Sequence, residues 1–225
     1  MSAEHRLITG EAGLYGKHPG FGDFVSAGLA EGWRGFGDWV QAALGQWRDG
    51  LGEDWQARFD AAPVLCFWIG PVLCGIGQSL RGIMAPSRDR SGRRFPLAVA
   101  QTGGAAPVLD PAQDFYAAAA QALAALLATP GFEPREAQAA LDLPSPGAEG
   151  PGWPGFWAGN PALGPQALLA QLAGADHAHA TAARSYWWFS GGEDGPSGVL
   201  CCQGWPSTEE LDWLLRAGQG PKVPA

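Results

Sequence analysis

The chain has 225 residues, 46% of them hydrophobic, which is enough for one large domain or two small ones and excludes a chain that is disordered as a whole. Its formal net charge of -8 and its pI near 4.9 argue against a general nucleic-acid or anionic-membrane surface, because both need positive charge spread over the protein. The N-terminal residues lack an apolar signal core and the four cysteines lack C-x-x-C spacing, so we expect free thiols in a cytoplasmic protein.

The first predicted elements are two short strands and a long helix. Residues 14–17 and 23–26 flank a bend at 18–22 that is rich in Gly and Pro, a pattern typical of an edge strand followed by a tight turn. From Trp33 to Leu51, apolar residues recur at helical spacing. Trp33, Trp47 and Trp39 in this segment predict a stripe that packs on a sheet. A second short helix is expected over 54–61.

The stretch from 63 to 100 is predicted to form the core of that sheet. Its apolar runs at 64–69 and 95–100 are short, rich in β-branched and aromatic residues, and bounded by Gly and Pro, which favours buried strands over helices. A strongly basic loop precedes the last run. Five arginines stand here against a single acid, Asp89: Arg81, Arg88, Arg90, Arg93 and Arg94. We therefore expect a local positive patch on an acidic protein.

The second half of the chain predicts more helices and a hairpin. Helices are expected at 110–128, 136–143 and 166–172, the first with Asp110 as N-cap and Gln113 in its capping box. A Pro/Gly-rich crossover occupies about 144–164. Strands at 184–190 and 198–203 flank an acidic turn, and 207–210 is a capping box before a last helix. We predict one α/β domain over residues 1–225, with a mixed, largely antiparallel sheet and helices on both faces; a division near Pro144 is the alternative.

The motif search gives little support for an enzyme. A phosphate-binding loop, a G-x-S-x-G elbow and an H-E-x-x-H zinc motif are all missing from the sequence, so we expect no cofactor and no metal. The basic loop is the best candidate for function, because Arg side chains bind carboxylate or phosphate groups in a bidentate manner. It could dock an acidic or phosphorylated protein segment. Alternatively, Asp23 and Asp89 could pair with its arginines and make the loop a rigid connection.

Three separated motifs, taken in order, resemble the TagF (also ImpM) family of type VI secretion accessory proteins. The pattern of that family resembles G-x-Y-G-K-x-P-x-x-G-D-F, followed by a central P-S-x-D-x-x-G-R-x-F-P-L and a distal W-W. The matching residues here are Gly13-Leu-Tyr-Gly-Lys17 with Gly22-Asp-Phe24, Pro86-Ser-Arg-Asp89 with Gly92-Arg-Arg-Phe-Pro-Leu97, and Ser185-Tyr-Trp-Trp188. His18 stands in place of the usual aliphatic residue, and Arg94 in place of the usual aromatic one.

The resemblance implies a three-layer α/β/α sandwich and a cytoplasmic, non-enzymatic regulator. Such a protein restrains the type VI secretion apparatus after translation by binding its forkhead-associated scaffold protein. A second hypothesis is a metal-dependent hydrolase or phosphatase that uses Asp23 and Asp89, which would require carboxylates that converge on a metal ion. The motif positions that we predict to bind the partner or to hold the motifs together are Lys17, Asp23, Ser87, Asp89, Arg90, Arg93, Arg94, Trp187 and Trp188.

Overall fold

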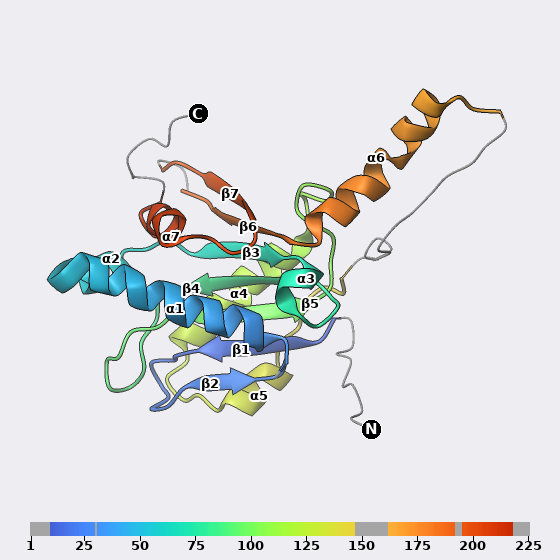
Figure 1. The fold of residues 1–225 in the computed structure, drawn as a ribbon. Helices are drawn as coiled ribbons and strands as arrows, with labels where there is room; N and C mark the ends of the chain where they lie inside the picture. Colours follow the sequence, from blue (N-terminus) through green and yellow to red (C-terminus); the bar gives the residue numbers. More distant parts are fainter. Residues whose placement is uncertain (1–9, 30, 147–161, 192–194, 218–225) are drawn as a thin grey trace, which may run out of the picture.

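A single sheet of seven strands organises the chain in the computed structural model, which describes residues 10–29, 31–146, 162–191 and 195–217 (Figure 1). The strand order is β2-β1-β5-β4-β3-β6-β7, and all six neighbouring pairs are antiparallel. The predicted sheet, mixed and largely antiparallel, is thus corrected to one that is antiparallel throughout the described residues. The strands are β1 (Ala12–Gly16), β2 (Val25–Ala27), β3 (Leu65–Ile69), β4 (Leu80–Ala85), β5 (Leu97–Thr102), β6 (Arg184–Phe189) and β7 (Gly198–Gln203).

The middle of the sheet is covered on both faces. All six residues of β4 and all six of β5 are buried, so these strands lack the alternation of apolar and polar residues that a half-exposed strand shows. At the edge of the sheet, β7 alternates instead: Val199 and Cys201 are exposed, whereas Cys202 is buried. The central stretch of the sequence therefore forms the core of the sheet, as predicted.

One face of the sheet packs against α1 (Trp33–Leu51), α2 (Trp55–Asp60) and α7 (Thr208–Leu215). Trp33 and Trp47 are buried in this layer and Trp39 is partly buried, which confirms the predicted packing role of the tryptophan stripe. The indole N–H of Trp47 donates to Asp212 Oδ1 at 2.9 Å and so joins α1 to α7. Two short elements, the 3-10 turn Gly52–Asp54 and α3 (Pro71–Cys74), complete this side.

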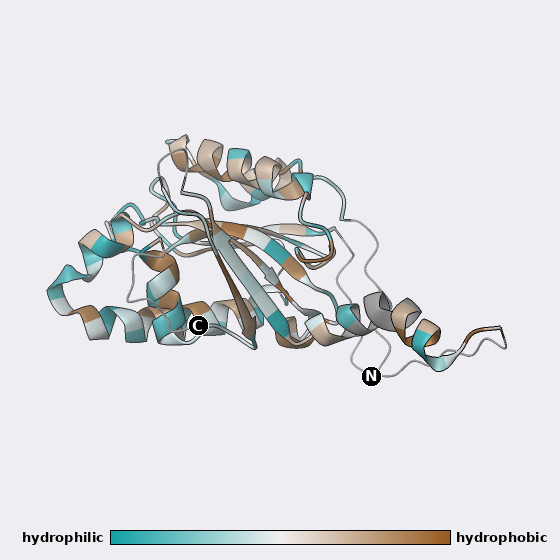
Figure 2. Ribbon diagram, turned by 90° about the horizontal axis from the view of Figure 1, so that it is seen from above, coloured by the Kyte–Doolittle hydropathy of each residue, from teal (hydrophilic) through white to brown (hydrophobic). Residues whose placement is uncertain are grey.

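The opposite face packs against α4 (Asp114–Ala128), with α5 (Pro134–Ala139) beside β1 and β2. Phe115, Ala119 and Leu123 of α4 bury their side chains against Ile83 and Val99. Figure 2 shows helices on both sides of the sheet, so the fold is of the α/β class. The remaining helix, α6 (Pro165–Thr181), contacts β6 and projects away from the sheet (Figures 1 and 2).

Several element boundaries differ from the sequence prediction. The α4 helix begins at Asp114 and not at the expected Asp110, with Gln113 as an N-cap residue that makes no side-chain cap. The α6 helix continues to Thr181 and does not end at 172. The predicted capping box before α7 is confirmed, because Ser207 and Glu210 bond each other's backbone N–H groups.

Two predicted segments fall partly outside the described residues. These are the Pro/Gly-rich crossover, of which 147–161 are not described, and the acidic turn, of which 192–194 are not described. All four cysteines are free, as the sequence predicted. In the described ranges, none of the helices is both long and apolar enough to cross a membrane.

Candidate functional site

The loop between β4 and β5 folds around the carboxylate of Asp89. Asp89 Oδ1 accepts hydrogen bonds from the backbone N–H groups of Ser91 at 2.9 Å and Arg93 at 3.0 Å. The Gly92 N–H donates to the Asp89 carbonyl at 2.9 Å, and Gly92 has a φ of +82°, a conformation that glycine adopts without steric cost. The motif D-x-x-G-R therefore forms a turn in which the Asp side chain accepts hydrogen bonds from backbone N–H groups of the same turn.

The second carboxylate oxygen of Asp89 binds two cations. Oδ2 accepts from Lys17 Nζ at 2.5 Å and from Arg93 Nε at 2.6 Å, and the Asp89 side chain is 0% exposed. Burial alone would raise the pKa of Asp89, but the hydrogen bonds from Lys17 and from the Arg93 backbone and side chain outweigh it and hold the pKa well below its usual range. The buried carboxylate is thus ionised. We call Lys17, Asp89 and Arg93 the Asp89 clamp.

Two arginines of the loop also bind the bend that follows β1. Arg90 Nη2 donates to the Gly20 carbonyl at 2.6 Å, and Arg93 Nη2 donates to the Gly22 carbonyl at 3.0 Å. The backbone N–H of Arg90 donates to the Phe21 carbonyl at 2.9 Å. The first and second sequence motifs, about 70 residues apart, therefore form one surface.

His18 anchors this bend from beneath. The Gly20 N–H donates to His18 Nδ1 at 3.0 Å, so the ring proton lies on Nε2, which donates to the Leu126 carbonyl at 2.7 Å. The imidazole is fully buried and stacks on Phe132, with ring centroids 3.8 Å apart. The polar residue at a position that is usually aliphatic in the resembling family is thus fully bonded and ties the bend to the end of α4.

Arg94 points away from the clamp and binds α2. Its Nε and Nη2 atoms donate to the two carboxylate oxygens of Asp60 at 2.8 and 2.7 Å, and its Nη1 donates to Gln56 Oε1 at 2.9 Å. The hydrogen bond from Arg94 is the main reason that the pKa of Asp60 is lowered. This guanidinium is committed to an internal contact, and the sequence did not identify its partner.

Asp23 does not join the clamp. It is exposed, and its Oδ1 accepts a hydrogen bond from the next backbone N–H, that of Phe24, at 2.8 Å. No ion pair involves Asp23 within the described part of the chain. The expectation of ion-pair acceptors is therefore confirmed for Asp89 and wrong for Asp23, because the loop arginines bind the backbone carbonyls of the bend and not its carboxylate.

The arrangement is unsuited to a metal shared by these two acids. Asp89 already accepts four hydrogen bonds on its two oxygens, and cationic groups of Lys17 and Arg93 occupy the space where a metal would be attracted. The described residues contain no group of three or more His, Cys, Asp or Glu side chains that could hold a metal ion. Ser87 contributes its backbone carbonyl, which accepts from the Phe95 N–H at 3.1 Å, while its buried hydroxyl has no hydrogen-bond partner there.

The two predicted tryptophans of β6 point to opposite faces of the sheet. Trp187 is 0% exposed, packs against Trp39 and donates from its indole to Ser185 Oγ at 3.0 Å. Trp188 is partly buried on the other face, with its ring centroid 4.6 Å from that of Tyr116. Trp187 is therefore a core residue and is not accessible to a partner.

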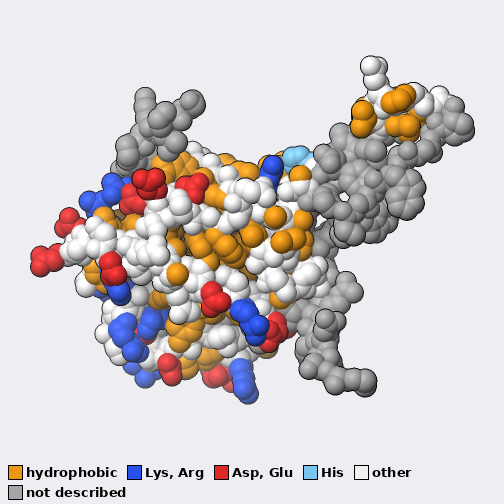
Figure 3. Space-filling view, in the orientation of Figure 1, with side chains coloured by type: hydrophobic (Ala, Val, Ile, Leu, Met, Phe, Trp, Pro, Cys, Tyr) orange, Lys and Arg blue, Asp and Glu red, His pale blue; other side chains and the backbone are white. Residues whose placement is uncertain are grey.

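The exposed charge of the loop comes from a subset of its arginines. Arg88 and Arg90 are exposed, and 63% of the Arg93 side chain remains accessible although it binds Asp89. Arg88, which was not among the predicted site residues, makes no side-chain hydrogen bond or ion pair with any described residue. In Figure 3, basic side chains gather where Figure 1 shows the loop between β4 and β5.

Arg81 belongs to a different site from the one predicted. It was counted with the basic loop, but it lies in β4 and is buried. Its guanidinium binds Gln101 Oε1, Gln113 Oε1 and the Pro144 carbonyl, and it lies 4.2 Å from the centroid of the Phe115 ring. A charged residue inside an otherwise apolar strand was the available signal for a buried polar network.

Comparisons with known proteins agree with these motifs. Residues 13–143 match the family model described as TagF N-terminal domain, Type VI secretion system-associated. The chain also resembles the crystal structure of PA0076 from Pseudomonas aeruginosa PAO1, with 30% sequence identity, a TM-score of 0.74, and coverage of 95% of this chain and 97% of that one. None of the curated proteins compared with it gives a match. The chain therefore belongs to the TagF family of type VI secretion system-associated proteins.

Proposed function

We propose that this protein is a non-enzymatic, cytoplasmic regulator that represses the type VI secretion system after translation by binding its forkhead-associated scaffold protein. The observation that carries the proposal is the Asp89 clamp, whose carboxylate is buried and fully bonded, while Arg88, Arg90 and Arg93 of the loop that it holds are exposed. Membership of a type VI secretion-associated family supports our proposal that the protein acts in that system. The clamp supports a binding role because Lys17 and Arg93 already bind the Asp89 carboxylate, which a metal-dependent hydrolase would need as a metal ligand.

The partner surface that we propose consists of Arg88, Arg90 and the accessible part of Arg93. Arg94 is excluded because Asp60 and Gln56 already bind its guanidinium. The guanidiniums of Arg90 and Arg93 are held in place by their hydrogen bonds, so they lose less conformational freedom on binding than free ones. All three guanidiniums suit carboxylate or phosphate groups. We therefore propose that the scaffold presents an acidic or phosphorylated face to this loop.

The test is a titration of purified scaffold protein against the wild type and an Arg88→Glu, Arg90→Glu double variant at two salt concentrations. Arg93 stays unchanged in this design because its charge belongs to the clamp. We expect the double variant to bind at least about 10-fold more weakly, and wild-type binding to weaken as salt rises, because exposed charges are screened over about 8 Å at physiological ionic strength.

The matched control carries the same change of charge elsewhere. Arg34 lies in the first turn of α1, at the end away from α2, and Arg184 begins β6. The Arg34→Glu, Arg184→Glu variant should bind like the wild type, with folding of both variants checked by circular dichroism. If the folded loop variant binds as tightly as the wild type and binding does not respond to salt, the loop has only a structural role.

We further propose that residues 1–225 form one domain with the three-layer α/β/α architecture of the resembling family. Two observations support this. The strands β6 and β7 extend the sheet that β1 to β5 begin, and helices pack on both faces of that sheet.

A further inference from the structure

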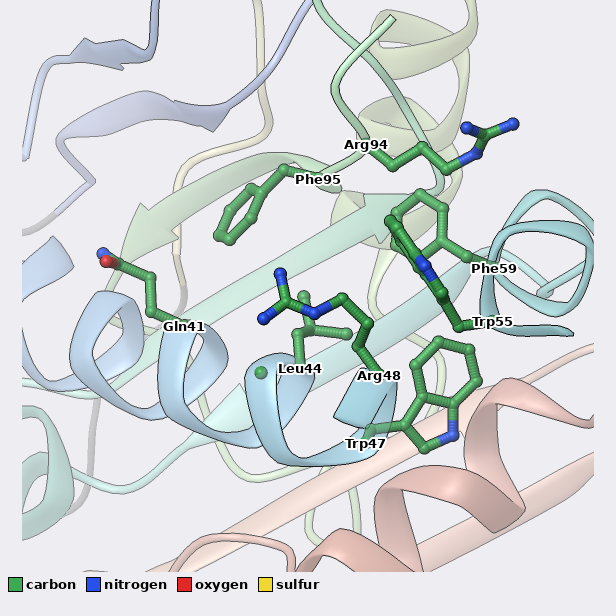
Figure 4. Close-up of a pocket in the computed structure, with 9 residues that line it drawn as sticks. Gln41, Leu44, Trp47, Arg48, Trp55, Phe59, Arg94 and Phe95 are labelled. Atoms are coloured by element: carbon green, nitrogen blue, oxygen red, sulfur yellow. The ribbon is translucent and has the colours of Figure 1, made fainter. Parts of the chain in front are cut away.

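A hollow lies beside the arginine loop, between α1, α2 and the segment that enters β5 (Figure 4). Its volume is about 260 Å³. Four of its nine lining residues are aromatic, Arg48 on α1, Arg94 and Gln41 contribute its polar lining, and none of the residues that line it is acidic. The lining residues include Gly45, Arg48, Trp55, Phe59, Arg94 and Phe95.

Gly45 keeps this hollow open. Two other glycines of α1 are required by packing, because a Cβ at Gly37 would lie 2.4 Å from the Tyr15 hydroxyl and one at Gly35 would lie 2.9 Å from the Leu73 carbonyl. A Cβ at Gly45 would meet nothing within 4 Å. Because glycine weakens a helix interior relative to alanine, this residue has a cost that packing does not explain, and a side chain there would enter the hollow.

The size of the hollow favours a single side chain over a small-molecule ligand. Pockets for small molecules usually measure about 300–1,000 Å³, so this one is below that range. Hot spots of protein interfaces are large side chains that fill such pockets. Trp55, Phe59 and Phe95 offer apolar contact, so the fitting occupant is a bulky apolar side chain.

The positive charge at the edge of the hollow favours acidic residues next to that side chain in the partner. Arg94 is neutralised by Asp60, but the Arg48 side chain is 53% exposed and, among the residues that the structure describes, pairs only with the adjacent, exposed Asp49 at 3.2 Å. An exposed ion pair like that of Arg48 and Asp49 contributes little free energy, so an incoming carboxylate can replace Asp49. Arg94 and Phe95 also end the arginine loop, so a partner that covers the loop reaches the hollow.

We propose that this hollow is the anchor site for one bulky apolar side chain, flanked by carboxylates, of the protein segment that binds the arginine loop. The inference rests on the proposed function, because it supplies the specific contact for the same partner. The loop would attract the partner's negative charge, whereas the hollow would select the segment that fits.

The experiment compares two glycines of the same helix. Gly45→Leu fills the hollow, and Gly50→Leu is its matched control, because Gly50 also has open space around its Cβ position and does not line the hollow. In titrations with purified scaffold protein, Gly45→Leu should lower affinity at least about 30-fold and Gly50→Leu less than about 3-fold. Equal affinities for the two variants and the wild type would overturn the anchor while leaving the proposed function in place.

A peptide probe tests the hollow without the scaffold protein. The probe is a fluorescein-labelled heptapeptide with one phenylalanine between aspartates, compared with versions that carry alanine for phenylalanine or asparagine for aspartate. Wild type and Gly50→Leu should bind the first peptide best, and Arg48→Gln should no longer distinguish aspartate from asparagine. If the scaffold fails to bind even the wild type, the proposed function fails. The peptide then tests the hollow by itself. If neither the loss of phenylalanine nor Gly45→Leu changes peptide binding, the proposed anchor site is wrong.

Discussion

Asp89 and Arg81 are both buried, but the protein compensates their charges in opposite ways. Asp89 receives two cationic side chains and two backbone N–H groups. Arg81 receives amide and carbonyl oxygens and the face of Phe115, with no carboxylate within ion-pair distance among the described residues. Burial is the main cause that lowers the pKa of Arg81, whereas donors lower the pKa of Asp89 despite burial. One environment therefore favours the charged form, and the other opposes it.

The two residues therefore have different structural roles: Asp89 holds a surface loop, whereas Arg81 links elements in the interior. The Asp89 clamp fixes a loop whose outer arginines are exposed. Arg81 connects β4 to β5, to the start of α4 and to the backbone of Pro144, and exposes almost nothing. We expect the clamp to matter for partner binding and for stability, and Arg81 for stability alone.

The largest effect should come from Asp89→Ala. Removing the carboxylate leaves Lys17 and Arg93 without their counter-ion and two backbone N–H groups without an acceptor. Loss of one partner from a buried ion pair costs about 3–5 kcal/mol of unfolding free energy. Chemical denaturation followed by circular dichroism measures this. A loss of unfolding free energy below about 1 kcal/mol would show that the loop keeps its conformation without the clamp.

Acid should weaken the clamp in a defined range of pH. Because the folded-state pKa of Asp89 lies below the ordinary value of about 3.9, its stabilising effect is complete above that value and is lost as pH falls through the lower, folded-state pKa. The difference in unfolding free energy between wild type and Asp89→Asn should be constant from about pH 5 to 7 and narrow below about pH 4. The half-exposed Asp60, whose pKa is lowered by Arg94, should give a smaller change when replaced by Asn.

Arg81→Met should cost less than the loss of Asp89, at most about 2 kcal/mol. Methionine keeps most of the apolar stem and removes a buried charge that no acid compensates, but it leaves Gln101 and Gln113 each without a donor. Thermal and denaturant unfolding of both variants under one buffer tests the order. A cost equal to that of Asp89→Ala would mean that Arg81 is held as a charge, with Asp110 acting on it from beyond ion-pair distance.

Much of the fold could be predicted from the sequence because its signals are local. The tryptophan stripe of α1, the apolar runs of the sheet and the capping box at Ser207 each act over a few residues, and each is found in the structure. The pairing of strands is not local, and the antiparallel order of the sheet could not be derived from the same patterns. The start of α4 shows the same limit, because Arg81 and two backbone carbonyls use the Gln113 side chain that was expected in a capping box.

The sequence predicted some residues of the candidate site, such as Asp89, Arg90 and Arg93, but missed Arg88 and most of the contacts. The sequence places Asp89 among arginines, which is sufficient to expect an ion pair. It does not reveal that Lys17 would complete the clamp, or that Arg94 would bind Asp60 on α2, because those partners lie 72 and 34 residues away. The hollow was missed entirely, since its walls come from three separate segments.

The smallest effect should come from Asp23→Ala, although the sequence suggested a role equal to that of Asp89. Its carboxylate is exposed and accepts one hydrogen bond, from Phe24 N–H, which water can replace in the variant. We expect a loss of about 0.5 kcal/mol and no more than about 1, against several for Asp89→Ala in the same assay. The two aspartates thus form a matched pair with the same substitution at different burial. If Asp23→Ala unfolds as easily as Asp89→Ala, the bend at 18–24 depends on that carboxylate as much as the loop depends on its clamp, and the contrast between the two is wrong.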